Sequence, residues 1–161
     1  MKNSEKAYFP LFVDLRDKKI VVIGAGNIAS RRIKVLCDFC ADITVIAPEA
    51  SQDVRTLEAE GEIKLICKKY EKEDITGAFI VLAATDEADL NKQIYNDCKE
   101  KDIIVNISSD KSLCDFYFPG IVKQGTMVVG VSASGTAHKK ARLVREAAAR
   151  AMEKVLSEEM P

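Results

Sequence analysis

The sequence predicts an α/β fold built on a doubly wound parallel sheet. Five short apolar runs, rich in β-branched residues, recur between residues 19 and 107, and stretches with helical spacing of apolar residues separate them. Short continuous apolar runs are typical of strands buried on both faces of a parallel sheet. A glycine-rich turn follows the first run directly. Strands that alternate with helices imply right-handed crossovers onto both faces of one sheet.

Strands are expected at residues 19–23, 43–47, 63–67, 79–84 and 103–107. Helices are expected at residues 28–39, 51–60 and 87–100, each with apolar residues near one face. In the third helix, for example, Leu90, Ile94 and Cys98 recur at helical periods.

The pattern changes after Phe118-Pro119-Gly120. A single further strand is expected at 127–131, then a turn of small residues at 132–136 and a helix at 138–156. The helix carries one apolar stripe, made of Ala141, Val144, Ala148, Ala151, Met152 and Val155. A lone strand and helix bury little apolar surface, so they should dock on the main sheet or on a partner chain. We favour a partner, which makes residues 114–161 a dimerisation segment beside a domain at 1–113.

Composition narrows the function classes. The chain has 161 residues, 47% of them hydrophobic, and a net charge of −1. Because its net charge is close to zero and it has few aromatic residues, the chain lacks the features typical of nucleic-acid binding. No apolar run could span a bilayer and the N-terminus lacks the apolar core of a signal peptide, so we expect a cytoplasmic protein without a membrane partner.

The five cysteines are expected to be free thiols, because an odd number in a chain without a signal peptide argues against a disulfide framework. Cys37 and Cys40 have C-x-x-C spacing, but no second pair or histidine cluster completes a metal site. We therefore expect no metal ligands and interpret the pair as the buried end of a helix.

The motif with the clearest chemistry is Gly24-Ala-Gly26-Asn-Ile-Ala29, which fits G-x-G-x-x-G/A. It follows a predicted strand and opens a predicted helix, the context that a dinucleotide-binding turn of the Rossmann type requires. Gly24 would permit the tight turn, Gly26 would let the backbone approach a pyrophosphate, and Ala29 would keep helix and strand close. The helix N-terminus would then offer N–H groups to the phosphates. A nucleotide-free fold with a glycine-rich turn remains the alternative.

The adenosine half of such a cofactor would lie after the second strand. Glu49 is the candidate for the ribose hydroxyls, and no Arg or Lys lies between Ile43 and Asp53 to bind a 2′-phosphate. This favours NAD over NADP. The fourth strand ends in small residues, Ala84 and Thr85, at the sheet edge where ligands bind, and Asp86 is expected to cap the next helix.

Five stretches together resemble the precorrin-2 dehydrogenase family, including the N-terminal module of siroheme synthase. They are FPLFVDLRDKKIVVIGAGNIASRR, ITVIAPE, VLAATDEADLN, VNISSD with LCDFYFPGIV, and VSASGTAHKKARLVR. The resemblance runs from about Tyr8 to Arg145, and its motifs agree in order and spacing.

The resemblance implies a reaction and its site. Members use NAD+ to take a hydride from precorrin-2, a carboxylate-rich tetrapyrrole, giving sirohydrochlorin for siroheme or cobalamin, and some also insert ferrous iron. It implies that Asn27, Ile28, Pro48 and Glu49 contact the cofactor. It also implies that Thr85 and Asn106 lie near the nicotinamide, and that the C-terminal segment forms a homodimer.

The catalytic position departs from the family pattern. Where the family has an aspartate after the last strand of the sheet, this chain has Ser109, with Asp110 one residue later. We take Asp110 and Ser109 as candidate catalytic residues, while a purely structural turn at Ser-Ser-Asp-Lys stays open. We expect the chain to lack the helical C-terminal domain that many members of the family carry. We therefore expect weak or no ferrochelatase activity.

The small-residue turn and the helix after it are candidates for substrate binding. The turn departs from the family pattern at Ala133, Ser134 and His138. Cationic side chains could receive the substrate's carboxylates, although a solvated helix face would show the same pattern. The candidate substrate residues are Ser134, Gly135, Thr136, Lys139 and Arg142. Besides a dehydrogenase, two alternatives remain: a non-catalytic module that binds NAD or tetrapyrrole, and an NAD-dependent redox sensor, which leaves CDFYFPG unexplained.

Overall fold

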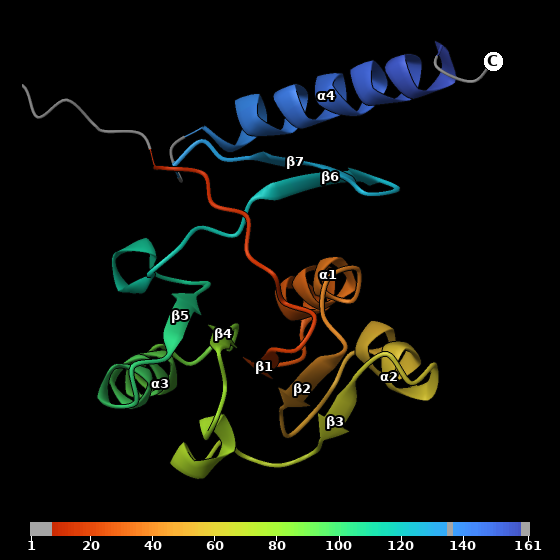
Figure 1. The fold of residues 1–161 in the computed structure, drawn as a ribbon. Coiled ribbons are helices and arrows are strands. Elements are labelled where there is room, and N and C mark those ends of the chain that lie inside the picture. The colour runs from red at the N-terminus through yellow and green to blue at the C-terminus, as the bar shows by residue number, and fades with distance from the viewer. Residues whose placement is uncertain (1–7, 135–136, 159–161) are drawn as a thin grey trace, which may run out of the picture. The chain divides into compact units, whose positions relative to one another are not determined.

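The computed structural model describes residues 8–134 and 137–158, which form two compact units (Figure 1). One unit is Val13–Phe116, and the other contains residues 8–12 and 117–158. Residues 8–12 therefore group with the C-terminal segment and not with the sheet that follows them.

The first unit contains a five-stranded sheet in which every pairing is parallel, in the order β3-β2-β1-β4-β5. The strands are β1 (Lys19–Ile23), β2 (Asp42–Ile46), β3 (Lys64–Ile66), β4 (Ile80–Ala83) and β5 (Ile104–Ile107). The chain moves outward from β1 to β3 and then returns to place β4 on the other side of β1. The predicted doubly wound sheet is confirmed, and its switch point lies between β1 and β4.

Helices cover both faces of this sheet. They are α1 (Asn27–Leu36), α2 (Gln52–Ala59) and α3 (Ala88–Glu100), and two short 3₁₀ helices lie at Lys72–Ile75 and Lys111–Leu113. Figure 1 shows α1 and α2 on one side of the strands and α3 on the other. Because successive side chains of a strand point to opposite faces, each strand contributes apolar groups to both layers. Val21 and Val81, for example, are fully buried in a cluster with Ile94 of α3.

The second unit contains a hairpin and a long helix. The hairpin pairs β6 (Gly120–Gln124) with β7 (Met127–Val131), and α4 (His138–Glu158) follows. The expectation of a single strand in this segment is wrong, because β6 was missed. Gln124 pairs with Met127, so the connection has two residues, and its first, Gly125, has a φ of +58°. A positive φ at this position suits the twist of a two-residue hairpin.

The apolar stripe expected on α4 is only partly covered within its unit. In this stripe Met152 is buried, whereas Val144 and Val155 are 55% and 48% exposed, and Leu143, which lies outside the stripe, is 63% exposed. Apolar side chains therefore remain on the surface of α4. None of the described helices combines the length and apolar character needed to cross a membrane.

Candidate functional site

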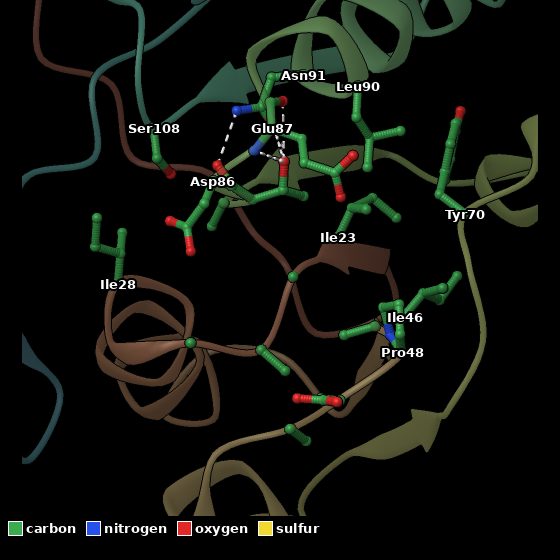
Figure 2. Close-up of a pocket in the computed structure, with 18 of the residues that line it drawn as sticks. Ile23, Ile28, Ile46, Pro48, Tyr70, Asp86, Glu87, Leu90, Asn91 and Ser108 are labelled. Carbon is green, nitrogen blue, oxygen red and sulfur yellow. Dashed lines mark hydrogen bonds between the residues drawn. The ribbon is translucent and has the colours of Figure 1, made fainter.

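A pocket of 1360 Å³ opens at the carboxyl ends of β1, β2 and β4 (Figure 2). Its walls come from the segments that follow all five strands and from the first turns of α1 and α3, and all of them belong to the first unit. Open parallel sheets bind their ligands at this edge, beside the point where strand order reverses. The pocket therefore lies where the fold favours a ligand.

Gly24 begins the turn after β1 and lines the pocket. Its φ is +102°, and a Cβ built on it would lie 2.5 Å from the carbonyl oxygen of Ala84. The Gly24 N–H donates to the Ile46 carbonyl at 2.9 Å, and the Ala84 N–H donates to the Ile23 carbonyl at 2.8 Å. The ends of β1, β2 and β4 are therefore hydrogen-bonded so close together that only glycine fits at position 24.

The N-terminus of α1 faces the pocket without a side-chain cap. Gly26 is the N-cap residue, no side chain bonds to the cap, and the first turn contains no acidic residue. A Cβ on Gly26 would meet nothing within 4 Å, whereas Ala29 is fully buried against the sheet. Asn27 and Ile28 line the pocket, so their backbone amides start a helix whose positive end is open to an anion.

One end of the pocket is formed by the segments after β2 and β3. Figure 2 shows Pro48 and Tyr70 at this end, and Ile28 and Ser108 at the other. Glu49, after β2, and Lys69, after β3, also line the pocket, so these segments supply one anionic and one cationic side chain. This end accordingly carries most of the side chains that could meet a ribose.

Ser51 connects this end of the pocket to the glycine turn. Its N–H donates to the Ala25 carbonyl at 3.0 Å, which joins the start of α2 to the turn after β1. Its hydroxyl oxygen is buried and has no hydrogen-bond partner among the described residues. A buried hydroxyl is unfavourable without a partner, and Ser51 lines the pocket, so a ligand could supply the missing bond.

The Tyr70 hydroxyl is held by a buried carboxylate, Asp97, which a partly exposed lysine also approaches. The hydroxyl donates to Oδ2 of Asp97 at 3.0 Å, and the Lys72 ammonium lies 3.6 Å from the other oxygen of that carboxylate. Asp97 is only 7% exposed. Burial, and then the hydrogen bond to Asp97, raise the pKa of Tyr70 above its ordinary value. The phenol therefore stays neutral and keeps its ring in a fixed position on the pocket wall.

The opposite end is organised by a buried amide, Asn91 of α3, which is 2% exposed. Its Nδ2 donates to the Thr85 carbonyl at 3.0 Å and to the Ser109 hydroxyl at 3.1 Å. Its Oδ1 accepts from the Thr85 hydroxyl at 2.8 Å. Thr85 and Ser109 both line the pocket, so one side chain connects the ends of β4 and β5.

Asp86 does not cap α3, and the expectation that it would is wrong. The N-cap residue is Glu87, which makes no side-chain cap bond. The Thr85 hydroxyl accepts the Glu87 N–H at 3.3 Å instead. Asp86 is left exposed on the pocket wall, where Figure 2 shows its carboxylate on the side of Ile28.

The two candidate catalytic residues lie in different surroundings. Ser109 lines the pocket, whereas Asp110 does not. The Asp110 carboxylate accepts from the backbone N–H and the hydroxyl of Ser112, at 2.8 and 2.7 Å. These bonds lower the pKa of this fully exposed carboxyl below its ordinary value. Asp110 thus caps the 3₁₀ helix after β5.

Asn106 also lies away from the pocket lining. It is 3% exposed, its Oδ1 accepts from Arg32 at 2.6 Å, and its Nδ2 donates to the Phe116 carbonyl at 2.7 Å. Arg32 also donates to Ser108, which does line the pocket, at 2.8 Å. The structure therefore places Asn106 behind the site, in a polar group that joins α1 to the end of β5.

The candidate substrate residues belong to the second unit. Ser134 has a φ of +50°, and its N–H donates to the Ser132 hydroxyl at 3.2 Å. Lys139 is exposed at the start of α4, and Arg142 forms an exposed ion pair with Glu146 at 2.8 Å. Gly135 and Thr136 lie outside the described residues. Among the described residues of both units, no three metal-binding side chains come together, and Cys40 is buried, where its thiol donates to the Lys18 carbonyl.

Comparisons with known proteins bear on this geometry. The model of a family described as "Putative NAD(P)-binding" matches residues 11–120. The chain belongs to this NAD(P)-binding family. Siroheme synthases of Psychrobacter sp. (strain PRwf-1) and Pseudoalteromonas atlantica are 40% and 37% identical, over 85% and 86% of this chain. The matched regions are only 28% and 30% of those relatives' lengths.

A solved structure gives a second comparison. SirC, precorrin-2 dehydrogenase, superposes with a TM-score of 0.75 and 28% identity, over 89% of this chain and 70% of that chain. Together with the siroheme synthases, it confirms the resemblance to the precorrin-2 dehydrogenase family.

The pocket fits the cofactor of the NAD(P)-binding family. The uncapped N-terminus of α1 suits a pyrophosphate, and the open space around Gly26 allows it to come close. The Ser51 hydroxyl, which has no hydrogen-bond partner in the part of the chain that the structure describes, lines the same pocket.

Several residues that line the pocket are not predicted from the sequence. They are Arg31, Lys69, Tyr70, Asn91 and Ser108. Arg31 follows the glycine motif within the same helix, and its position one turn into the helix could have indicated it. No local signal marks Tyr70 or Asn91, because their contacts form only when β3, α3 and β5 assemble.

Proposed function

We propose that this chain is an NAD-dependent precorrin-2 dehydrogenase that produces sirohydrochlorin. The observation that carries the proposal is the structural match to a precorrin-2 dehydrogenase over 89% of the chain, with 28% identity. The uncapped helix N-terminus and the open glycine turn give that match a cofactor site. When bound, NAD+ would accept the hydride, and the protein would bind and orient both reactants.

The residues of this chain would divide that work between the two ends of the pocket. The amides at Asn27 and Ile28 would hold the pyrophosphate, and Pro48 and Glu49 would flank the adenosine half. Thr85 and Ala84 would then lie towards the nicotinamide half, on the side of Ser109. Asn106 would support this end from behind, through the contacts it makes with Arg32 and Phe116.

NAD, and not NADP, is the cofactor that the charges favour. The Glu49 carboxylate can accept hydrogen bonds from ribose hydroxyls and would repel a 2′-phosphate. Lys69, which also lines the pocket, comes from the segment after β3, whereas Glu49 follows β2, where the ribose is expected. Binding constants for NAD+ and NADP+ measured on the same preparation would test this, and tighter binding of NADP+ would contradict it.

The carboxylates of the substrate would be held by the small-residue turn and the start of α4. Lys139 and Arg142 provide the cations, and Ser134, Gly135 and Thr136 provide backbone and hydroxyl groups. We also propose a homodimer, supported by the exposed apolar side chains of Leu143, Val144 and Val155. Such a dimer would need no membrane and no nucleic acid.

Anaerobic assay of the purified protein tests the dehydrogenase. NAD+ and freshly generated precorrin-2 are mixed with the protein, and the absorbances of NADH and sirohydrochlorin are followed. We expect turnover that depends on the protein. No such turnover, with NAD binding intact, would leave only a binding module.

The same assay separates the two catalytic candidates. If Asp110 handles a proton, Asp110→Ala should lower kcat and leave NAD affinity unchanged. If its carboxylate only caps the turn through Ser112, kcat should stay the same. Ferrous iron added to sirohydrochlorin tests for chelatase activity, which we expect to be weak or absent.

A further inference from the structure

The buried amide of Asn91 determines which hydroxyl group can act as a donor in the pocket. The dashed lines in Figure 2 show its bonds, which reach the residues at the ends of β4 and β5. The orientation of this amide is set by chemistry, because the Thr85 carbonyl can only accept a hydrogen bond. Nδ2 must therefore face that carbonyl, and Oδ1 must face the Thr85 hydroxyl.

In this orientation the Thr85 hydroxyl donates its hydrogen within the protein, whereas the Ser109 hydroxyl accepts from Asn91 and does not donate to it. Two acceptors lie within reach of the Thr85 hydroxyl, the Oδ1 of Asn91 at 2.8 Å and the Glu87 carbonyl at 3.3 Å. Both belong to the protein. The Ser109 oxygen, in contrast, accepts from Nδ2 of Asn91 and keeps its own hydrogen. Ser109 is exposed on the pocket wall, so that hydrogen can be donated to a ligand.

We infer that Asn91 is a positioning residue that makes Ser109 a hydrogen-bond donor to an acceptor oxygen of the bound cofactor or substrate. The inference rests on the proposed function, because the acceptor oxygen belongs to the cofactor or the substrate of that function. It concerns the end of the pocket away from Pro48 and Glu49. A hydroxyl without a neighbouring base is a poor general base, which agrees with a donor role. The acceptor is a carboxamide oxygen if it belongs to the nicotinamide, and a carboxylate oxygen if it belongs to the tetrapyrrole.

The test is a double-mutant cycle with Ser109→Ala and Asn91→Ala. Asn96→Ala serves as the matched control, because Asn96 is an exposed asparagine on the same helix and does not line the pocket. The readouts are the Kd of NADH from fluorescence titration, kcat and KM for precorrin-2, and the melting temperature of each variant.

Loss of one ligand hydrogen bond predicts roughly a tenfold effect for Ser109→Ala. If Asn91 acts through Ser109, the double variant should lose little more than Asn91→Ala alone, whereas independent roles would multiply the two losses. A change in the NADH Kd assigns the acceptor to the cofactor. A change confined to kcat or KM for precorrin-2 assigns it to the substrate.

If Asn91→Ala does not fold, Ser109→Thr provides the second test. It retains the hydroxyl, so it should keep most of the NADH affinity or precorrin-2 turnover that Ser109→Ala loses. Multiplying losses, or a Ser109→Ala variant that equals wild type in every readout, would overturn the inference. If the wild-type protein binds NADH but does not turn over precorrin-2, the proposed function fails on its own. The NADH titration then decides alone, and an unchanged Kd in Ser109→Ala overturns the inference.

Discussion

The two glycines of the dinucleotide motif should fail for different reasons when each is replaced by alanine. Gly24 has a φ of +102°, and a Cβ there would lie 2.5 Å from a backbone oxygen, that of Ala84. Gly26 has a φ of −84°, which any residue adopts, and a Cβ there would meet nothing within 4 Å. Gly24→Ala should therefore damage the fold, and Gly26→Ala should damage ligand binding.

The cost of Gly24→Ala can be worked out from the structure. A side chain held at this φ costs about 1–3 kcal/mol. Relief of the contact must move β1 and β4 apart, which weakens the Ala84 to Ile23 hydrogen bond, worth about 1 kcal/mol. The sum of about 2–4 kcal/mol should lower the melting temperature by roughly 5–15 °C in a domain of this size.

Gly26→Ala should change the melting temperature little, because alanine in place of glycine at an N-cap costs at most about 1 kcal/mol. Its methyl group would occupy the space that a pyrophosphate needs, so NAD+ affinity should fall at least roughly tenfold, about 1.4 kcal/mol. Thermal unfolding of both ligand-free variants, with calorimetric titration of NAD+, measures both effects. Wild-type affinity in Gly26→Ala, or wild-type stability in Gly24→Ala, would refute this reasoning.

Three more variants test single features of the pocket. Glu49→Gln should raise the affinity for NADP+ relative to NAD+ by roughly fivefold, since about 1 kcal/mol of repulsion is removed, and equal ratios in both proteins would contradict the role given to Glu49. Ser51→Ala should weaken NADH binding severalfold without lowering the melting temperature, because the hydroxyl it removes has no partner in the described part of the chain; a drop in melting temperature with unchanged binding would show a structural role. Tyr70→Phe tests the raised pKa of Tyr70. Above about pH 10 the Tyr70 phenol ionises in the unfolded chain before it does in the folded one, so the stability of the wild type should fall relative to the variant as pH rises. A constant difference between the two in urea unfolding across that range would contradict the raised pKa.

The parallel sheet could be predicted because its strands are buried on both faces and so appear as continuous apolar runs. The strand expected at 19–23 coincides with β1. The missed strand, β6, reads Gly-Ile-Val-Lys-Gln, and its residues are half-buried or exposed. Such a strand lacks the apolar continuity that reveals the others. The Gly125-Thr126 turn was the signal that could have indicated it.

The site was predictable where a residue's role depends on the local chain. Gly24 and Gly26 could be placed from the motif alone, because turn, helix start and strand are contiguous. The role of Asp86 could not, since it depends on where α3 begins. The contacts of Asn106 could not either, because they depend on the direction in which a strand side chain points. Asn106 pairs with Leu82 of β4, and its side-chain oxygen accepts a hydrogen bond from Arg32 of α1, which is distant in sequence.

The central claim is that this chain transfers a hydride from precorrin-2 to NAD+ at the pocket beyond β1 and β4. A single-turnover reaction tests it most directly, with the protein in excess over precorrin-2, saturating NAD+ and no oxygen. The account predicts that NADH and sirohydrochlorin form together in equal amounts, and that Gly26→Ala abolishes both at the same NAD+ concentration. Sirohydrochlorin formed without NADH, or NADH formation that survives unchanged in Gly26→Ala, would contradict it.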